Sequence, residues 1–172
     1  MKVIFMHDEL TKVDIKKMQE EIEYRRNILA PKLREEVRQA RELGDLSENF
    51  EYHAARREMN KNAGRINYLQ RMIDTAVVIE PESKEDSVSL FDTVTLYLED
   101  DDEEMTITIV TTLRQNSLKS LISKESPIGK VLLGKKLGDR IFVRVNDDYG
   151  YYAVIRKIEK GSDDESLEIS PY

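Results

Sequence analysis

Apolar residues between positions 8 and 76 recur at the three- and four-residue spacing of one helix face. The later stretch follows this spacing without a break and consists of Tyr52, Ala55, Met59, Asn62, Ile66, Leu69 and Ile73. An earlier, less regular stretch consists of Ile15, Met18, Ile22, Leu29, Leu33, Val37 and Ala40, with Arg25 on the same face. Two such faces predict an antiparallel coiled coil of two long helices. At about 1.5 Å per residue, ~30 residues make an arm roughly 45 Å long.

A few residues mark where these helices bend, end and align. Pro31 lies inside the first helix and should kink it, because proline removes a hydrogen bond and crowds the preceding turn. Gly44 suits the left-handed position after a helix end, and Asp45 or Ser47 can serve as N-cap of the second helix. Asn62 is the polar member of the second face, where a buried amide can fix the register of the pair.

After an exposed linker the periodicity changes from a helical one to two. Strands are predicted over residues 88–98, 105–112, 140–145 and 151–158, with turns at 99–104 and 146–150. Ser126, Pro127 and Gly134 mark one short helix, as its N-cap, its first residue and the glycine beyond its end. We therefore expect an α+β chain with a coiled coil over 1–80, a linker over 81–87, a mostly antiparallel sheet domain with one helix over 88–160 and a loose acidic tail over 161–172.

Charge and composition narrow the classes of function. The net charge of −7 arises in the C-terminal half, because residues 1–80 hold fifteen basic and fifteen acidic residues and residues 81–172 hold twelve and nineteen. This acidity argues against a free-standing nucleic-acid-binding protein. The chain has no cysteine and two distant histidines, which excludes disulfides, a thiolate nucleophile and the usual kinds of zinc site. Without a membrane-spanning run or a signal-peptide core, we expect a cytoplasmic protein.

The turn of the expected hairpin carries two carboxylates three residues apart, Asp45 and Glu48. Asp-x-x-Glu at a helix start predicts a capping box, and the helix dipole favours both acids there. The same carboxylates are oxygen ligands for a hard cation, but two of them bind Mg²⁺ weakly, so a metal role requires further ligands from a partner. The two interpretations are compatible, because capping uses only some of the oxygen atoms.

Basic residues follow both helices below this turn: Arg34, Arg38, Arg41, Arg56, Arg57, Lys61 and Arg65. Because glutamates are interleaved with them, intrahelical ion pairs account for most of these charges. As a functional patch they would instead hold a phosphate backbone. Phe50 and Tyr52 are suited to stack on a base, although Tyr52 also belongs to the packed face.

Two long motifs give the chain a family resemblance. Residues 40–56, which include the run Gly-Asp-Leu-Ser-Glu-Asn-Phe-Glu-Tyr, resemble the coiled-coil tip of the bacterial GreA/GreB transcript-cleavage factors. Residues 121–139, which include Ser-Pro-Ile-Gly-Lys-Val-Leu-Leu-Gly, resemble the C-terminal globular domain of the same family. The resemblance covers most of residues 10–160. It implies an N-terminal coiled coil followed by an FKBP-like domain.

The resemblance also implies a mechanism. The globular domain docks on RNA polymerase at the mouth of its secondary channel, and the coiled-coil tip enters the channel. There Asp45 and Glu48 help to hold a second Mg²⁺ and an attacking water, and the polymerase hydrolyses the extruded 3′ end of a backtracked transcript. The implied polymerase-docking residues are Ser126, Pro127, Ile128 and Gly129. The implied RNA-facing residues are Arg41, Arg56, Arg57 and Tyr52.

On this resemblance the chain is a GreA-like, monomeric activator and not itself an enzyme. Its implied partners are RNA polymerase and the nascent RNA 3′ end, without a membrane, and its Mg²⁺ is shared with the polymerase rather than bound tightly. One alternative is a channel-binding regulator that does not promote cleavage, although such tips carry a denser acidic cluster. Another is an FKBP-like chaperone or prolyl isomerase, whose pockets are lined with aromatic residues, whereas residues 88–160 contain no Trp and few Phe. A third is a coiled-coil adaptor, whose activity would survive Asp45→Asn with Glu48→Gln.

Overall fold

The computed structural model describes residues 8–42 and 49–170. Grouped by contacts, the chain forms a helical unit, Ile15–Ala76, and a globular unit, Met1–Asp14 with Val77–Tyr172. The residues next to both ends of the hairpin therefore group with the sheet, whereas the boundaries expected from the sequence placed them in the coiled coil. In the part of the chain that the structure describes, no helix is both long and apolar enough to cross a lipid bilayer.

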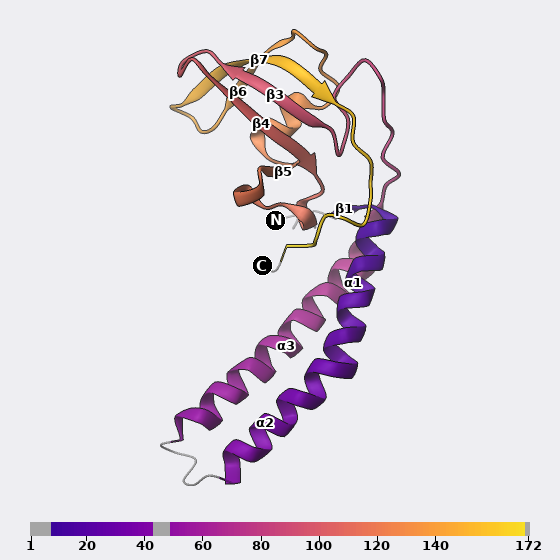
Figure 1. The fold of residues 1–172 in the computed structure, drawn as a ribbon, viewed down its shortest axis with the longest axis vertical. Helices are drawn as coiled ribbons and strands as arrows, with labels where there is room; N and C mark the ends of the chain where they lie inside the picture. Colours follow the sequence, from indigo (N-terminus) through magenta and orange to yellow (C-terminus); the bar gives the residue numbers. More distant parts are fainter. Residues whose placement is uncertain (1–7, 43–48, 171–172) are drawn as a thin grey trace, which may run out of the picture. The chain divides into compact units, whose positions relative to one another are not determined.

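The helical unit is a hairpin in which α2 and α3 run side by side in opposite directions (Figure 1). Its first arm consists of α1 (Lys12–Tyr24), a π-helical turn (Arg25–Leu29) and α2 (Ala30–Glu42), and its second arm is α3 (Phe50–Thr75). Every residue of the two predicted apolar faces is buried or half-buried, and most residues on the remaining helix surface are exposed. The predicted pairing of two apolar helix faces is confirmed.

Pro31 is accommodated by a change of helix type in the turn before it. The π-helical turn ends at Leu29, and the Ala30 N–H donates to the carbonyl of Arg25, five residues back. Proline cannot donate to the carbonyl four residues back and its ring crowds that carbonyl, so a wider turn at this point relieves the conflict. The disturbance that the sequence predicts at Pro31 therefore takes the form of a π-helical turn.

A polar cluster interrupts the packed face of the hairpin. Buried Asn62 accepts a hydrogen bond from Arg25 Nη1 at 3.2 Å and donates to the Arg25 carbonyl at 3.3 Å. The Glu21 carboxylate accepts from Arg25 Nε at 2.6 Å and from Arg65 Nε and Nη2 at 2.9 and 3.1 Å. A shift in register would separate these partners and leave charges unpaired in a partly buried site. Asn62 is thus buried and paired, and its effect on register stays a prediction.

The hairpin is expected to lose stability in acid as Glu21 titrates. Burial alone would raise the pKa of the Glu21 carboxyl, but hydrogen bonds from Arg65 and Arg25 outweigh burial and hold the pKa below 4.5. A carboxyl whose pKa is lower in the folded state adds stability above 4.5, and this contribution is lost as the pH falls from there through the folded pKa. Thermal melts by circular dichroism should show that Glu21→Gln loses less stability on acidification than the wild type. Exposed Glu23→Gln should keep the wild-type pH profile, and identical profiles for all three proteins would contradict the assignment.

The globular unit contains a five-stranded mixed sheet with the strand order β5-β4-β3-β7-β6. The strands are β3 (Thr93–Leu98), β4 (Glu103–Val110), β5 (Leu121–Ser123), β6 (Arg140–Arg144) and β7 (Gly150–Glu159). Neighbours are antiparallel except β4 and β5, which are parallel. The four predicted strands and both predicted turns are present, with shifted ends, and β5 was not predicted. The expected α+β fold, a helical hairpin followed by a mainly antiparallel sheet with one short helix, is confirmed.

The core of the globular unit lies between the sheet and helix α4. Helix α4 (Pro127–Leu132) places Leu132 among buried residues of four strands, which include Val94, Leu96, Ile109 and Ile155. Two 3-10 turns, Thr112–Arg114 and Ser117–Lys119, lie between β4 and β5. A separate parallel pair, β1 (Glu9–Leu10) and β2 (Val77–Val78), joins the segments that precede and follow the hairpin.

The acidic segment after β7 is not loose, in contrast to the sequence-based expectation. The Ser170 N–H donates to the Leu113 carbonyl at 2.7 Å, and Leu167 packs against a buried cluster of Phe91, Val110 and Leu121. A leucine within an acidic run is a weak signal, because charge dominates the local composition. The contacts that order this segment come from residues far away in the sequence.

Candidate functional site

Asn49 is the N-cap of α3, the position that the sequence assigned to Asp45 or Ser47. Its Oδ1 accepts the Tyr52 N–H at 2.9 Å, and its Nδ2 donates to the Ala40 carbonyl at 2.6 Å near the end of α2. One amide therefore caps α3 and ties its start to the other arm. The prediction of the N-cap was wrong because Asn, Asp and Ser cap helices equally well, and the sequence offers all three within five positions.

The predicted catalytic and metal-ligating pair, Asp45 and Glu48, lies outside the described residues, as does Gly44. Among residues 8–42 and 49–170, no group of three or more histidine, cysteine, aspartate or glutamate side chains is placed to hold a metal ion. The described residues that flank the pair are Glu42 at the end of α2 and Asn49 before α3.

The two aromatic residues at the start of α3 have opposite environments. Tyr52 is 7% exposed and packs against Val37 and Ala40, whereas Phe50 is 88% exposed. The Tyr52 hydroxyl accepts a hydrogen bond from Arg41 Nη2 at 3.5 Å, and this bond holds the pKa of the hydroxyl below its ordinary value. The Tyr52 ring is thus a packing element, and its expected contact with RNA stays a prediction. The exposed aromatic ring at this end of α3 is Phe50.

Some of the predicted basic residues of the hairpin form ion pairs within their own helix. Arg38 pairs with Glu35 at 2.6 Å and Glu42 at 2.5 Å, and hydrogen bonds from Arg38 and Gln39 lower the pKa of Glu35 to about 2. Lys61 pairs with Glu58 at 2.7 Å. Arg38 and Lys61 thus form the ion pairs within one helix that the interleaved glutamates predict.

Of the exposed basic residues, Arg41, Arg56 and Arg57 lie close to the start of α3. Arg41 and Arg56 both lower the pKa of the Tyr52 hydroxyl. The two arms of the hairpin therefore bring these two cations close to the same hydroxyl. No ion pair joins any of the three to an acidic side chain within the described ranges. The candidate RNA-facing cations are therefore exposed, and their contact with RNA stays a prediction.

The predicted docking residues form the start of α4. Ser126 Oγ accepts the Gly129 N–H at 3.0 Å and donates to the Ser123 carbonyl at 2.7 Å, and Pro127 is the first helical residue. A Cβ at Gly129 would lie 2.3 Å from the Ser123 carbonyl oxygen, so this position requires glycine. Pro127 is exposed, Ile128 is half-buried against the core and Gly129 is buried. The predicted cap and helix are confirmed, and the exposed part of the site is centred on Pro127.

Sequence comparisons match both units. The family model for the transcription elongation factor N-terminal domain matches residues 9–78, and the model for the GreA/GreB C-terminal domain matches residues 82–160. The GreA of Thermoanaerobacter pseudethanolicus is 44% identical over 137 residues, which cover 79% of this chain and 87% of the relative. The chain belongs to the GreA/GreB family of transcription elongation factors. Residues 161–172 of this GreA-like factor lie beyond both family matches.

Other relatives span similar lengths. The GreA of Nautilia profundicola is 38% identical over 151 residues, which cover 87% of this GreA-like factor and 93% of the relative. Among solved structures, GreA factor homolog 1 of Thermus thermophilus is 24% identical with a TM-score of 0.41, and the match covers 90% of this chain and 99% of that one.

Proposed function

We propose that this factor binds RNA polymerase, inserts the turn of its hairpin into the secondary channel and stimulates the polymerase's own Mg²⁺-dependent cleavage of backtracked RNA 3′ ends. The observation that carries this proposal is the cap of α3. Asn49 satisfies the Tyr52 N–H, so α3 does not require Asp45 or Glu48 as its N-cap. The carboxylate pair at the turn of a GreA-like factor is then available for chemistry.

The hairpin is a suitable support for carrying that pair into a narrow channel. Helix α3 alone has 26 residues and so extends about 39 Å. Buried residues of α2 and α3, which include Val37, Ala40 and Tyr52, hold the two arms together close to the turn. This packing fixes the described ends of α2 and α3 against each other, and pre-organised chemistry requires such a firm support.

Exposed side chains beside the turn suit the RNA that the turn would meet. Arg41, Arg56 and Arg57 offer positive charge to phosphates, and exposed Phe50 offers a ring on which a base can stack. The backbone of the RNA would thus be held by arginines while Phe50 contacts an unpaired base. This division of labour positions a 3′ segment without reading its sequence.

The carboxylates of Asp45 and Glu48 fit Mg²⁺, which prefers hard oxygen ligands. When bound, the ion supplies Lewis-acid activation of water and phosphate. Because two carboxylates bind Mg²⁺ weakly, the polymerase must supply the remaining ligands, and the cleavage activity belongs to the complex. The role of Asp45 and Glu48 is to complete a site that is otherwise built by the polymerase.

The start of α4 provides a preformed surface for docking on the polymerase. Ser126 caps the helix and Gly129 permits a close approach of the chain to Ser123, so the loop has one shape before any partner arrives. Exposed Pro127 has few conformations to lose on binding. These features support a docking role for residues 126–129.

The test is a cleavage assay on a stalled, backtracked elongation complex. The factor should shorten the transcript from its 3′ end in the presence of Mg²⁺, and the factor alone should leave the same RNA intact. Cleavage by the factor without polymerase would contradict the shared site. Binding to the complex without any shortening would instead identify a channel-binding regulator.

A further inference from the structure

The segment that follows β7 is attached to the globular unit at its first residues. Lys160 Nζ donates to Asp92 Oδ2 at 2.5 Å, and the Gly161 N–H donates to Asp92 Oδ1 at 3.1 Å. A Cβ at Gly161 would lie 1.9 Å from the Phe91 carbonyl oxygen. The close approach of the two backbones therefore requires glycine at the point where the chain leaves the sheet.

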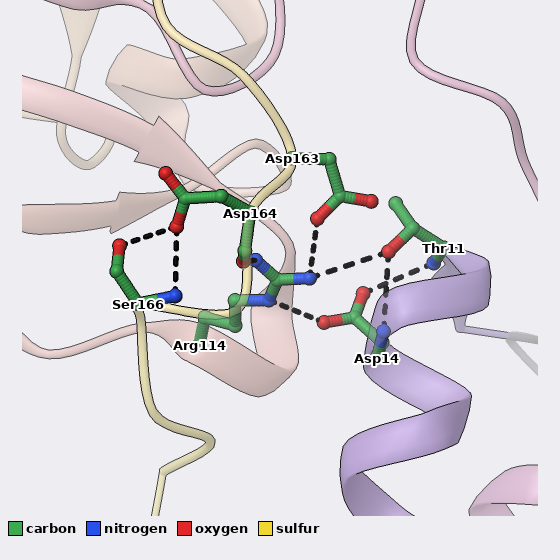
Figure 2. A network of polar contacts seen from close by, with 6 residues as sticks. All are labelled: Thr11, Asp14, Arg114, Asp163, Asp164 and Ser166. Carbon is green, nitrogen blue, oxygen red and sulfur yellow. Dashed lines mark hydrogen bonds and ion pairs between the residues drawn. The ribbon is translucent and has the colours of Figure 1, made fainter.

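The middle of the segment binds a buried arginine. Asp163 Oδ1 accepts from Arg114 Nη2 at 2.6 Å, and the Asp164 carbonyl accepts from Arg114 Nη1 at 3.1 Å (Figure 2). The Arg114 side chain is 0% exposed and its guanidinium lies 4.9 Å from the centroid of the Phe91 ring. The Asp163 side chain is 13% exposed. Almost all of this ion pair is thus shielded from water.

The same guanidinium also binds the first turn of α1. Arg114 Nε donates to Asp14 Oδ1 at 2.5 Å, and Nη2 donates to Thr11 Oγ1 at 3.3 Å (Figure 2). Thr11 and Asp14 form a capping box, because Asp14 Oδ2 accepts the Thr11 N–H and Thr11 Oγ1 accepts the Asp14 N–H. Arg114 therefore joins the segment that precedes the hairpin, at Thr11 and Asp14, to the segment that follows β7, at Asp163.

The two carboxylates on Arg114 are held with unequal strength. Asp14 is 0% exposed and its second oxygen is fixed by the capping box, whereas Asp163 retains contact with water. Two anions share one cation, so each weakens the hold of the other. Asp163 is the partner that can leave to solvent at the lower cost, and Asp14 then keeps Arg114 paired.

The end of the segment is held by apolar and backbone contacts. Leu167 packs on the cluster of Phe91, Val110 and Leu121, and the Ser170 N–H donates to the Leu113 carbonyl at 2.7 Å. The segment therefore has three successive attachments, at Gly161, Asp163 and Leu167–Ser170. None of these residues pairs with another strand in a ladder, so the segment can detach without breaking the sheet.

We propose that residues 161–170 form a releasable strap, latched by Asp163 on Arg114, that opens as a unit while the sheet stays folded. In the closed strap Arg114 and the Phe91 cluster are covered, and in the open strap they are exposed. Opening places the Asp163 carboxylate in solvent, where salt screens and stabilises a free charge, so added salt favours the open form. This device is independent of the proposed cleavage function, since it involves no residue assigned to cleavage, RNA or docking.

Amide hydrogen exchange of the full-length chain, followed by NMR, tests the strap. In the wild type the Ser170 amide should be protected, but less than the amides of β3 and β4, and its protection should fall with added salt. Asp163→Asn should lower Ser170 protection roughly tenfold and leave the slowest β3 and β4 amides unchanged. Glu168→Gln removes the same charge from an 86% exposed side chain, 3.9 Å from Lys119, and should change neither.

Gly161→Ala provides an independent variant. Its Cβ would collide with the Phe91 carbonyl oxygen and so displace the first residue of the strap without changing any charge. It should lower Ser170 protection as Asp163→Asn does, and the effect should not depend on salt. An unprotected Ser170 amide in the wild type would overturn the strap. Unchanged protection of the Ser170 amide in Asp163→Asn would overturn the latch. An equal loss of protection in the β3 and β4 amides would overturn the opening of the strap independently of the sheet.

Discussion

Asp45→Asn is expected to reduce factor-stimulated transcript cleavage at least about a hundredfold while leaving binding to RNA polymerase unchanged. The amide has nearly the same shape as the carboxylate but lacks the negative charge that a hard cation requires. A hundredfold loss corresponds to about 2.7 kcal/mol of transition-state stabilisation, which is within the range expected when a metal ligand is removed. The measurement is the rate of transcript shortening in a backtracked complex saturated with factor.

The matched control is Glu51→Gln. Glu51 is an exposed acid in the first turn of α3, three residues after Glu48, and its replacement removes the same charge near the turn. It should retain most of the activity. Raising the Mg²⁺ concentration should partly restore Asp45→Asn, because a weakened metal site is refilled by mass action. Full cleavage by Asp45→Asn, or an equal loss in Glu51→Gln, would contradict the assigned role.

The hairpin could be predicted because its burial follows a local period. Apolar residues of a packed helix face recur every three or four positions. The burial of Met18, Val37 and Leu69 can therefore be predicted from their spacing, without knowledge of the partner helix. The same reason explains the short helix after Ser126, whose cap, proline and terminal glycine are all local signals.

The contacts that the sequence did not reveal are long-range or depend on a choice between similar side chains. Arg114 binds Asp14 across 100 positions of sequence, and neither residue differs in type from a surface charge. Strand β5 has three residues, too few to show a period of two. At the turn, local rules allowed several N-caps, and the bond from Asn49 to Ala40 of the other arm selects Asn49.

The misses at Arg114 and at Asn49 share one cause, which is that polar residues carry little pattern. An apolar residue is recognised by its spacing, whereas a buried charge is recognised only once its partner is known. The Arg114 cluster is accordingly the part of the globular unit where a single substitution tests most directly what the fold adds to the sequence.

Arg114→Met is expected to destabilise the globular unit by about 3–5 kcal/mol, because it leaves the carboxylate of Asp14 buried without its cation. The change should lower the Tm of this unit by at least about 10 °C, because a unit of this size shifts by several degrees for each kcal/mol. The stability of Arg114→Lys should fall between those of the wild type and Arg114→Met. An ammonium keeps the charge but cannot bond Asp14, Asp163 and Thr11 in one plane. The slowest-exchanging amides of β3 and β4, measured by hydrogen exchange, report the stability of this unit separately from that of the hairpin.

Two further variants separate the loss of the ion pair from the loss of side-chain volume. Arg156→Met removes an exposed arginine whose guanidinium lies 5.0 Å from the centroid of the Tyr97 ring, and it should cost less than about 1 kcal/mol. Adding Asp14→Asn to Arg114→Met removes the unpaired charge and should restore part of the lost stability, whereas Asp14→Asn alone should destabilise the wild type. If Arg114→Met is as stable as Arg156→Met, or if the double variant is no more stable than Arg114→Met, a stranded carboxylate is not the source of the effect.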